Sequence, residues 1–322
     1  MTALSTPGGA ALPGGAALPG GAALPGAVRR PRRDGALAAL PSGLWYAAFF
    51  LLPLAAIVLY SFGAKPVGPG IVDLASPSTA NYAAVLDDTF TSTFRQTVQT
   101  SALSTLLLLV VAFPVAYTVA TRVSPAWRPL LLGLVIVPFW TSFLLRTFAW
   151  RIILSPLGPL SEGLVGIGVL DAPLAVLDTR GAVQLGLLYN YLPLMIFPLF
   201  VALDRIDPAL REAGKDLGAG RVRTFLTVTA PLALPGVVAG VLLVFIPLMG
   251  EYVTPTVLGG AKGLMVGNLV ASQFLEAQNV PLGSAMAVVL VGLTLAVIGV
   301  VASVCLLART LVRRARSVEL PA

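Results

Sequence analysis

The strongest constraint on this chain is a set of six apolar windows, each free of Asp, Glu, Lys and Arg. They are residues 35–64 (with a core at Leu44–Phe62), 96–121, 129–145, 181–203, 224–250 and 277–308. Because a helix rises 1.5 Å per residue, about 20 apolar residues cross a hydrocarbon core. Only 11% of the 322 residues are charged, against about 25% in a soluble domain. The sequence therefore predicts an all-α polytopic membrane protein with six transmembrane helices.

Two segments need interpretation within this scheme. The window 129–145 is short, so we expect its helix to continue past Arg146 toward Trp150, with the arginine side chain reaching the interface. Residues 152–177 are also apolar, but they contain three prolines, four glycines and two acids. Such a composition favours a folded loop or an interfacial helix over a seventh span.

The basic residues predict the orientation. With six spans, 15 of the 21 Lys and Arg residues fall on the side that holds both termini, and six on the other side. The six are Lys65, Arg95, Arg146, Arg151, Arg180 and Lys262. Positive-inside bias then places both termini in the cytoplasm. Basic residues next to span ends also explain the net charge of +7 better than nucleic-acid binding does.

The ends of the chain differ from its middle. Residues 7–12 (Pro-Gly-Gly-Ala-Ala-Leu) recur at 13–18 and 19–24, which predicts a disordered tail over 1–34. The apolar run after Arg29–Arg33 is too long for a signal peptide, so 35–64 is interpreted as an uncleaved signal anchor in the cell membrane. Residues 65–95 are expected to form an extracytoplasmic loop, and 309–322 a basic cytoplasmic tail.

The loop at 204–234, between the fourth and fifth windows, is long enough to hold a helix. Asp207 followed by Pro208 is a typical helix start, and Gly218 with Gly220 can end the helix in a left-handed turn. Leu210, Ala213, Gly214 and Leu217 share one face, and Arg211, Glu212, Lys215 and Asp216 surround it. Such a helix suits docking into a groove of another protein, or packing on its own bundle.

Glu212-Ala213-Gly214, followed by Gly218, Val228 and Pro231, resembles the EAA loop of binding-protein-dependent ABC importers. This chain has Gly214 at the third position, usually Ala, and Ala230 where the pattern has Leu. The resemblance covers roughly Leu44 to Leu307 and implies the type I ABC importer permease fold over 96–308. It implies that the loop is a coupling helix docking on cytoplasmic ABC ATPase subunits. ATP and Mg would bind those subunits, because this chain has no GxxxxGK[ST] phosphate loop and is expected to bind no cofactor or metal itself.

The remaining implied partners are a second permease subunit of the same fold, forming a heterodimer, an extracellular substrate-binding protein and membrane lipid. Residues 138–150, 188–193 and 245–260 look like those of spermidine/putrescine permeases, and of the first of their two paired subunits. Permeases for sulfate, molybdate, thiamine and ferric iron share the fold and the loop, so these solutes stay open.

A translocation pathway is expected near Glu251, because an ionisable residue close to the end of an apolar span usually faces a polar path or a partner. Tyr252, Trp140 and Tyr189 could add cation–π contacts to a polyamine; the alternative is an interfacial acid beside aromatic anchors. Prolines at 114, 138, 193, 198 and 247 are expected to bend helices around a cavity. An ion-driven secondary transporter or an intramembrane enzyme is less consistent, since the chain has no His and shows neither inverted repeats nor paired acids within the spans.

Overall fold

The computed structural model describes residues 34–318, with side chains for residues 40–300, 302 and 303. The predicted N-terminal repeat lies outside the described residues. Within them the chain is helical almost throughout, and the single β-bridge joins Ala64 and Asp73. The first half of the chain contains α1 (Asp34–Tyr46), η1 (Ala47–Leu51), α2 (Leu52–Tyr60), α3 (Ala80–Val85), α4 (Asp88–Thr121), α5 (Arg128–Ile136), η2 (Val137–Trp140), α6 (Phe143–Ile153) and α7 (Pro159–Gly166). The second half contains α8 (Arg180–Asp204), α9 (Pro208–Asp216), α10 (Arg221–Thr224), η3 (Phe225–Thr229), α11 (Ala230–Met249), η4 (Pro255–Gly259), η5 (Gly260–Gly263), α12 (Val266–Leu275) and α13 (Val280–Val318).

Five helical segments of the described chain are long and apolar enough to cross a membrane, and a bent pair can supply a sixth span. The five are Leu40–Tyr60, Asp88–Thr121, Arg180–Asp204, Arg221–Met249 and Val280–Val300. Residues 152–177 are not among them: they contain the last two residues of α6 and the short helix α7. The structure thus agrees with six spans when the bent pair is taken as one.

The bent pair corrects the expectation for the third window. The chain is helical past Arg146 and Trp150 as expected, but in the separate helix α6, which meets the segment Arg128–Trp140 at 88°. Thr141 between them has extended backbone angles, and Pro138 lies in the 3-10 turn just before the bend. Arg146 does not extend outward from the bundle: the residue is 8% exposed, and its guanidinium carbon lies 4.8 Å from the centre of the Phe139 ring. The sequence predicted an interfacial position for this arginine, whereas packing against Phe139 buries it.

Within the described residues, 34–52 and 53–318 form two separate compact units. In the first unit, every side chain from Leu40 to Leu52 is exposed. Leu44, Phe49 and Leu51 are among them, as expected for an apolar helix whose surroundings are lipid or a partner.

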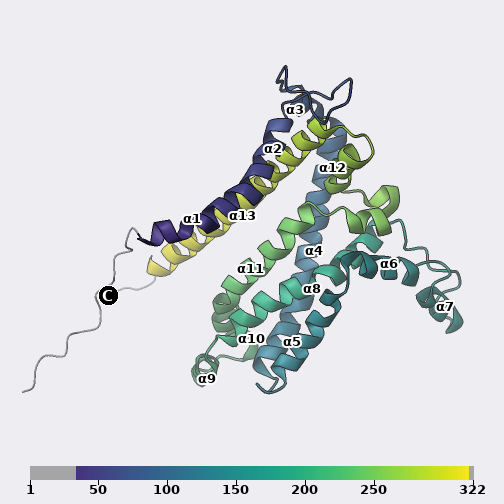
Figure 1. Ribbon diagram of the computed structural model, residues 1–322. Helices are drawn as coiled ribbons and strands as arrows, with labels where there is room; N and C mark the ends of the chain where they lie inside the picture. Colours follow the sequence, from purple (N-terminus) through teal and green to yellow (C-terminus); the bar gives the residue numbers. More distant parts are fainter. Residues whose placement is uncertain (1–33, 319–322) are drawn as a thin grey trace, which may run out of the picture. The chain divides into compact units, whose positions relative to one another are not determined.

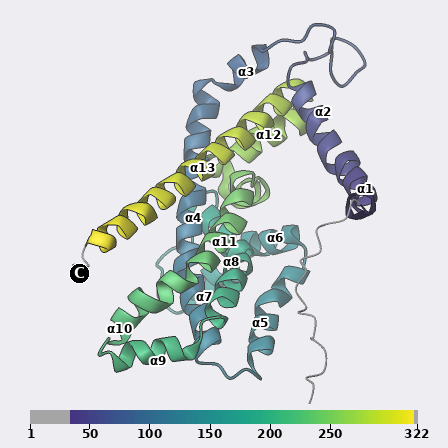
Figure 2. The same ribbon diagram turned by 90° about the vertical axis from the view of Figure 1, so that its left-hand side faces the viewer.

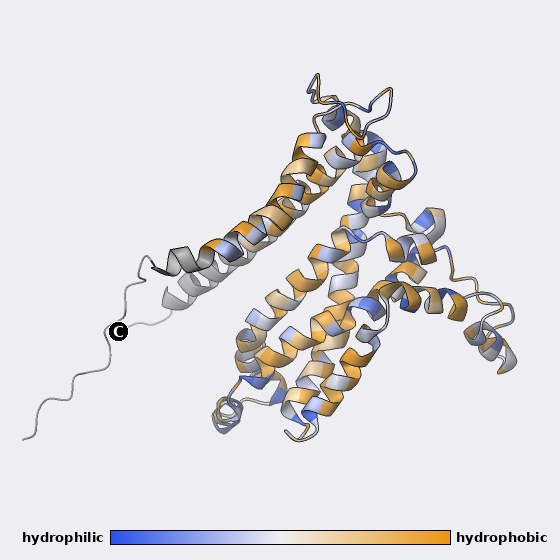
Figure 3. Ribbon diagram, viewed as in Figure 1, coloured by the Kyte–Doolittle hydropathy of each residue, from blue (hydrophilic) through white to orange (hydrophobic). Residues whose placement is uncertain are grey.

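The core of the second unit lies where α4, α8 and α11 pack side by side (Figures 1 and 2). Its fully buried residues include Leu108 of α4, Leu187 and Leu199 of α8, and Val244 of α11. A smaller core joins α3, α12 and α13 to Phe90 at the start of α4 and Met249 at the end of α11. Figure 3 shows these helices coloured mostly as apolar, with hydrophilic residues gathered on α9 and the connecting loops.

Two glycines of α11 allow its close contact with α8. A Cβ added at Gly236 would lie 2.4 Å from the Ala202 Cβ, and one at Gly240 would lie 2.8 Å from the Met195 sulfur. Gly236 and Gly240 are four residues apart, the spacing that brings membrane helices into backbone contact. Pro114, Pro193, Pro198 and Pro247 all lie inside helices that continue past them.

Candidate functional site

The short helix α9 stands between the ends of α8 and α10 (Figure 2). Asp207 caps it, its side-chain oxygen accepting a hydrogen bond from the Ala209 amide at 2.9 Å, and Pro208 opens the first turn. At the other end Gly218 adopts a left-handed conformation with φ of +79°. The Ala219 amide bonds to the Gly214 carbonyl and the Gly218 amide to the Lys215 carbonyl, which together make a Schellman cap.

These bounds confirm the predicted helix and correct its surroundings. Gly220 is not part of the left-handed turn: its φ is −60° and it precedes α10 as N-cap. The helix that follows runs without interruption from Arg221 to Met249. The loop expected over 204–234 therefore ends at Gly220, and Pro231 lies in the first turn of α11, directly after the π-helical segment η3.

The four residues expected to share one face of α9 face two directions. Leu210, Ala213 and Leu217 are exposed, and Leu217 most of all, at 89%. Gly214 instead turns toward the chain's own helix, where an added Cβ would lie 3.3 Å from the Thr224 methyl carbon and 3.7 Å from Val228. An exposed apolar face thus remains on α9, while the glycine allows α9 to approach α10 and η3.

The charged residues around this face are mostly exposed. Glu212, Lys215 and Asp216 are exposed, and Arg211 is half-buried. Beside the start of α9, a groove of about 580 Å³ runs between α8 and α11. Its lining includes Ala202, Arg205, Leu210, Leu232 and Pro235.

Glu251, the acid expected in the pathway, lies in the interior, 7% exposed. One carboxylate oxygen accepts the Val253 and Thr254 amides at 2.9 and 3.0 Å, and the other accepts the Tyr191 hydroxyl at 2.6 Å. Glu251 therefore caps the helical turn that leads into η4 and links it to α8.

Tyr191, which sequence reasoning missed, is the aromatic partner of Glu251. It lies four residues after Leu187 and four before Met195, both fully buried, so the 3.6-residue period could have marked it as a polar residue on the inner face of α8. Tyr189 faces elsewhere and packs edge-on against Trp150, with ring centres 5.5 Å apart.

More buried polar groups surround this junction. The Asn190 side-chain amide donates to the Thr147 hydroxyl at 3.2 Å. Three buried atoms, the Asn190 side-chain Oδ1, the Thr254 hydroxyl and the Arg146 Nε, have no hydrogen-bond partner among the described residues. Of the other expected pathway residues, Trp140 is 85% exposed at the bend before α6, and Tyr189 and Tyr252 are partly exposed.

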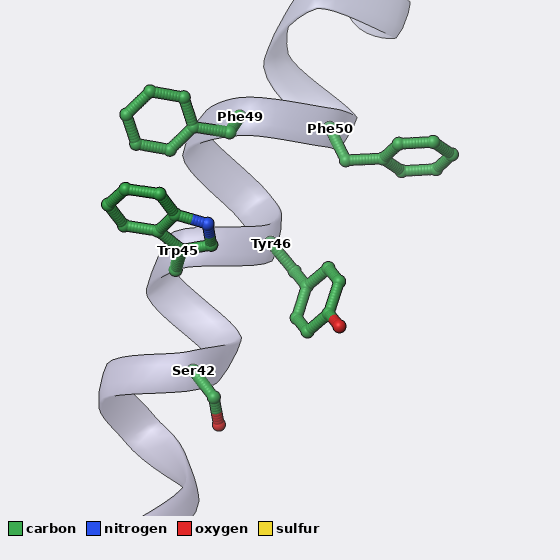
Figure 4. A pocket seen from close by; sticks show the side chains of 5 residues that line it. All are labelled: Ser42, Trp45, Tyr46, Phe49 and Phe50. Carbon is green, nitrogen blue, oxygen red and sulfur yellow. The ribbon is translucent and has the colours of Figure 1, made fainter. Parts of the chain in front are cut away.

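A further hollow lies on the first unit (Figure 4). It is lined by Ser42, Trp45, Tyr46, Phe49 and Phe50, whose side chains spread outward from one helix. Trp45 and Phe49 stack with ring centres 4.2 Å apart. Tryptophan and tyrosine near the end of an apolar span are typical of a membrane-interface belt.

Comparison with known proteins agrees with this architecture. The chain is similar to the spermidine/putrescine transport system permease protein PotB of Haemophilus influenzae, with 37% identity over 245 residues, 76% of this chain and 84% of that protein. The similarity to PotB of Escherichia coli is 39% over 210 residues, 65% of this chain and 76% of that protein. A chain of the bacterial alginate ABC transporter, solved in complex with alginate pentasaccharide-bound periplasmic protein, matches with a TM-score of 0.64 and 18% identity, covering 83% of this chain and 92% of that one.

That structural likeness shows the fold, which is the fold of an ABC importer permease. In addition, residues 101–317 match the sequence model of one family, about two thirds of the chain. The chain therefore belongs to the family of binding-protein-dependent transport system inner membrane components.

Proposed function

We propose that this chain is one of two paired permease subunits of an ATP-driven importer for spermidine and putrescine. The similarity to the two PotB spermidine/putrescine permeases supports these substrates, at 37% and 39% identity over most of their length. The alginate transporter's complex with a periplasmic protein supports delivery by an external binding protein. Sulfate, molybdate, thiamine and ferric iron are the competing cargoes.

The observation that carries the mechanism is the geometry of α9. Capped at both ends, it presents Leu210, Ala213 and Leu217 outward on a helix connected directly to α8 and, through α10, to α11. A rigid helix with an exposed apolar face and a charged rim suits a groove on a partner. In this proposal the partner is the cytoplasmic ATPase subunit, which binds ATP and Mg, and both termini lie on that side.

The contacts of α9 indicate how a displacement of this helix would be transmitted to the membrane helices. When ATP closes the partner subunits, α9 would move with them, and Gly214 would carry α10 and η3 along through Thr224 and Val228. Because Gly236 and Gly240 hold α11 against α8, the two helices would move together. This rocking would open the cavity alternately to the outside and the inside.

The same proposal includes a cargo path on the other side of the bundle. The exposed side chains of Trp140, Tyr189 and Tyr252 would contact the polyamine through cation–π interactions. Glu251 would not contact the polyamine directly. Its bonds to Tyr191 and to the turn before η4 would hold that turn against α8 beside the path.

Reconstitution tests the function. The two permease subunits with their ATPase are placed in liposomes, with the external binding protein and labelled spermidine outside and ATP on the ATPase side. We expect spermidine accumulation that needs both ATP and the binding protein. Accumulation of sulfate, molybdate, iron or thiamine without spermidine would contradict the polyamine assignment. Replacing the exposed Glu212 with Trp is expected to uncouple ATP hydrolysis from uptake while the chain still inserts into the membrane.

A further inference from the structure

An ion pair joins two helices at the end of α8 that leads into α9. Arg128 Nη1 lies 2.5 Å from Asp204 Oδ1, and the Arg128 Nε also donates to the Val123 carbonyl at 3.0 Å. Arg128 is the first residue of α5 and Asp204 the last residue of α8. The two side chains are 23% and 40% exposed, so water reaches the pair and its net strength as a simple surface contact is small.

The positions of the two charges argue that the pair connects helices and does not merely stabilise each one. A helix carries partial positive charge at its N-terminus and partial negative charge at its C-terminus. Arg128 lies at the N-terminus of α5 and Asp204 at the C-terminus of α8, so each charge is unfavourable for its own helix. Each is compensated by the other.

Helix α5 has few other attachments close to Arg128. It contains no fully buried residue, and Leu130 and Leu134 are more than half exposed, while Leu132 and Val135 pack, partly buried, against the main core. Between membrane helices apolar contact is not driven by exclusion of water, because lipid tails are as apolar as leucine. The ion pair is therefore a major attachment of α5 to α8 on this side.

A second polar contact attaches the far end of the same arm. Beyond the 88° bend, Thr147 of α6 accepts a hydrogen bond from Asn190 of α8. Asn190 and Asp204 are fourteen residues apart on α8, about 21 Å at 1.5 Å per residue. The arm formed by α5 and α6 is thus tied to α8 at both ends.

We propose that Arg128 and Asp204 are a positioning pair that carries the movement of α9 into the α5–α6 arm. Asp204 lies three residues before Asp207, the cap of α9, and buried Ile206 anchors the connection between them. A displacement of α9 therefore displaces Asp204, and the ion pair moves the arm that bears Trp140 and Arg146. This inference rests on the proposed coupling role of α9.

The test uses the complete reconstituted importer and measures spermidine uptake per ATP hydrolysed. Asp204→Asn and Arg128→Gln are each expected to lower this ratio at least about fivefold, the lower end of typical coupling between sites, while basal ATP hydrolysis persists. The exchanged pair, Arg128→Asp with Asp204→Arg, is expected to restore the ratio, since it rebuilds the ion pair and also places each charge at the favourable end of its helix. Arg122→Gln is the matched control, because it removes an exposed arginine of the same loop that makes no ion pair within the described residues.

Unchanged ratios in both single variants, or a lowered ratio that the exchange does not restore, would overturn the proposal. If the single variants reduce only the amount of assembled importer and leave the ratio intact, the pair is purely structural and the proposal is again wrong. If they do not assemble at all, the charge-conserving Arg128→Lys decides, because Lys lacks the second donor group that lets Arg128 bond both Asp204 and the Val123 carbonyl. A lowered ratio in the assembled Arg128→Lys importer supports the proposal, and a normal ratio contradicts it. If the wild-type importer takes up no spermidine, the proposed function is wrong, and the ion pair is then not the cause of the failure.

Discussion

The contact between α8 and α11 gives a prediction whose size follows from the coordinates. Replacing Gly236 with Ala places a Cβ 2.4 Å from the Ala202 Cβ and 2.6 Å from the Pro198 carbonyl oxygen. Ordinary contacts begin near 3.4 Å, so the helices must separate by about 1 Å. Overpacking of a tight interface costs about 1–3 kcal/mol. Each kcal/mol lowers Tm by about 2–4 °C in chains of 150–250 residues.

The assay is the thermal unfolding midpoint of the purified importer in detergent. We expect Gly236→Ala to lower it by several degrees and to reduce ATP-dependent uptake, because the two helices that lead to α9 no longer move together. Gly292→Ala on α13 is the control, since a Cβ there meets nothing within 4 Å. Equal midpoints for the two variants would refute the reasoning.

Two further variants probe the candidate site. Asp207→Ala removes the N-cap of α9, which we expect to cost about 1 kcal/mol and to weaken retention of the ATPase subunit during purification. Asp207→Asn keeps a hydrogen-bond acceptor at the cap and is expected to retain the ATPase subunit. Equal loss of the ATPase subunit in both variants would argue against the role of the cap. Glu251→Ala leaves the Tyr191 hydroxyl and two amides unpaired in the interior, so we expect about 3 kcal/mol of destabilisation or more, read as a lowered midpoint. In Tyr191→Phe only one of those bonds is lost, and a midpoint as low as that of Glu251→Ala would contradict the capping role of the carboxylate.

Local sequence signals predicted α9 well because its ends are set by neighbouring residues. Asp207 with Pro208 and the left-handed Gly218 are short-range devices, and the structure contains both. The apolar windows likewise located the spans, since their length reflects bilayer thickness alone.

Features set by tertiary contacts were missed. Pro138 predicted a bend within residues 129–145, but no local signal indicated that the chain would turn by as much as 88° after Trp140. Periodicity places Gly214 on the apolar face of α9, yet in the structure Gly214 faces Thr224 of α10 and Val228 of η3. Glu251 was identified as unusual for its position in an apolar span, but its partner Tyr191 comes from a helix 60 residues earlier.

The central claim is that α9 is the docking element for the ATPase, and site-specific photo-crosslinking tests it most directly. A photoreactive amino acid replaces Leu217, which is 89% exposed on α9, or Leu157, which is 84% exposed at the end of the bent arm. After illumination of the assembled importer, we predict a covalent product with the ATPase subunit from position 217 and none from position 157. The absence of that product at 217, or an equal yield at 157, would contradict the assignment of α9.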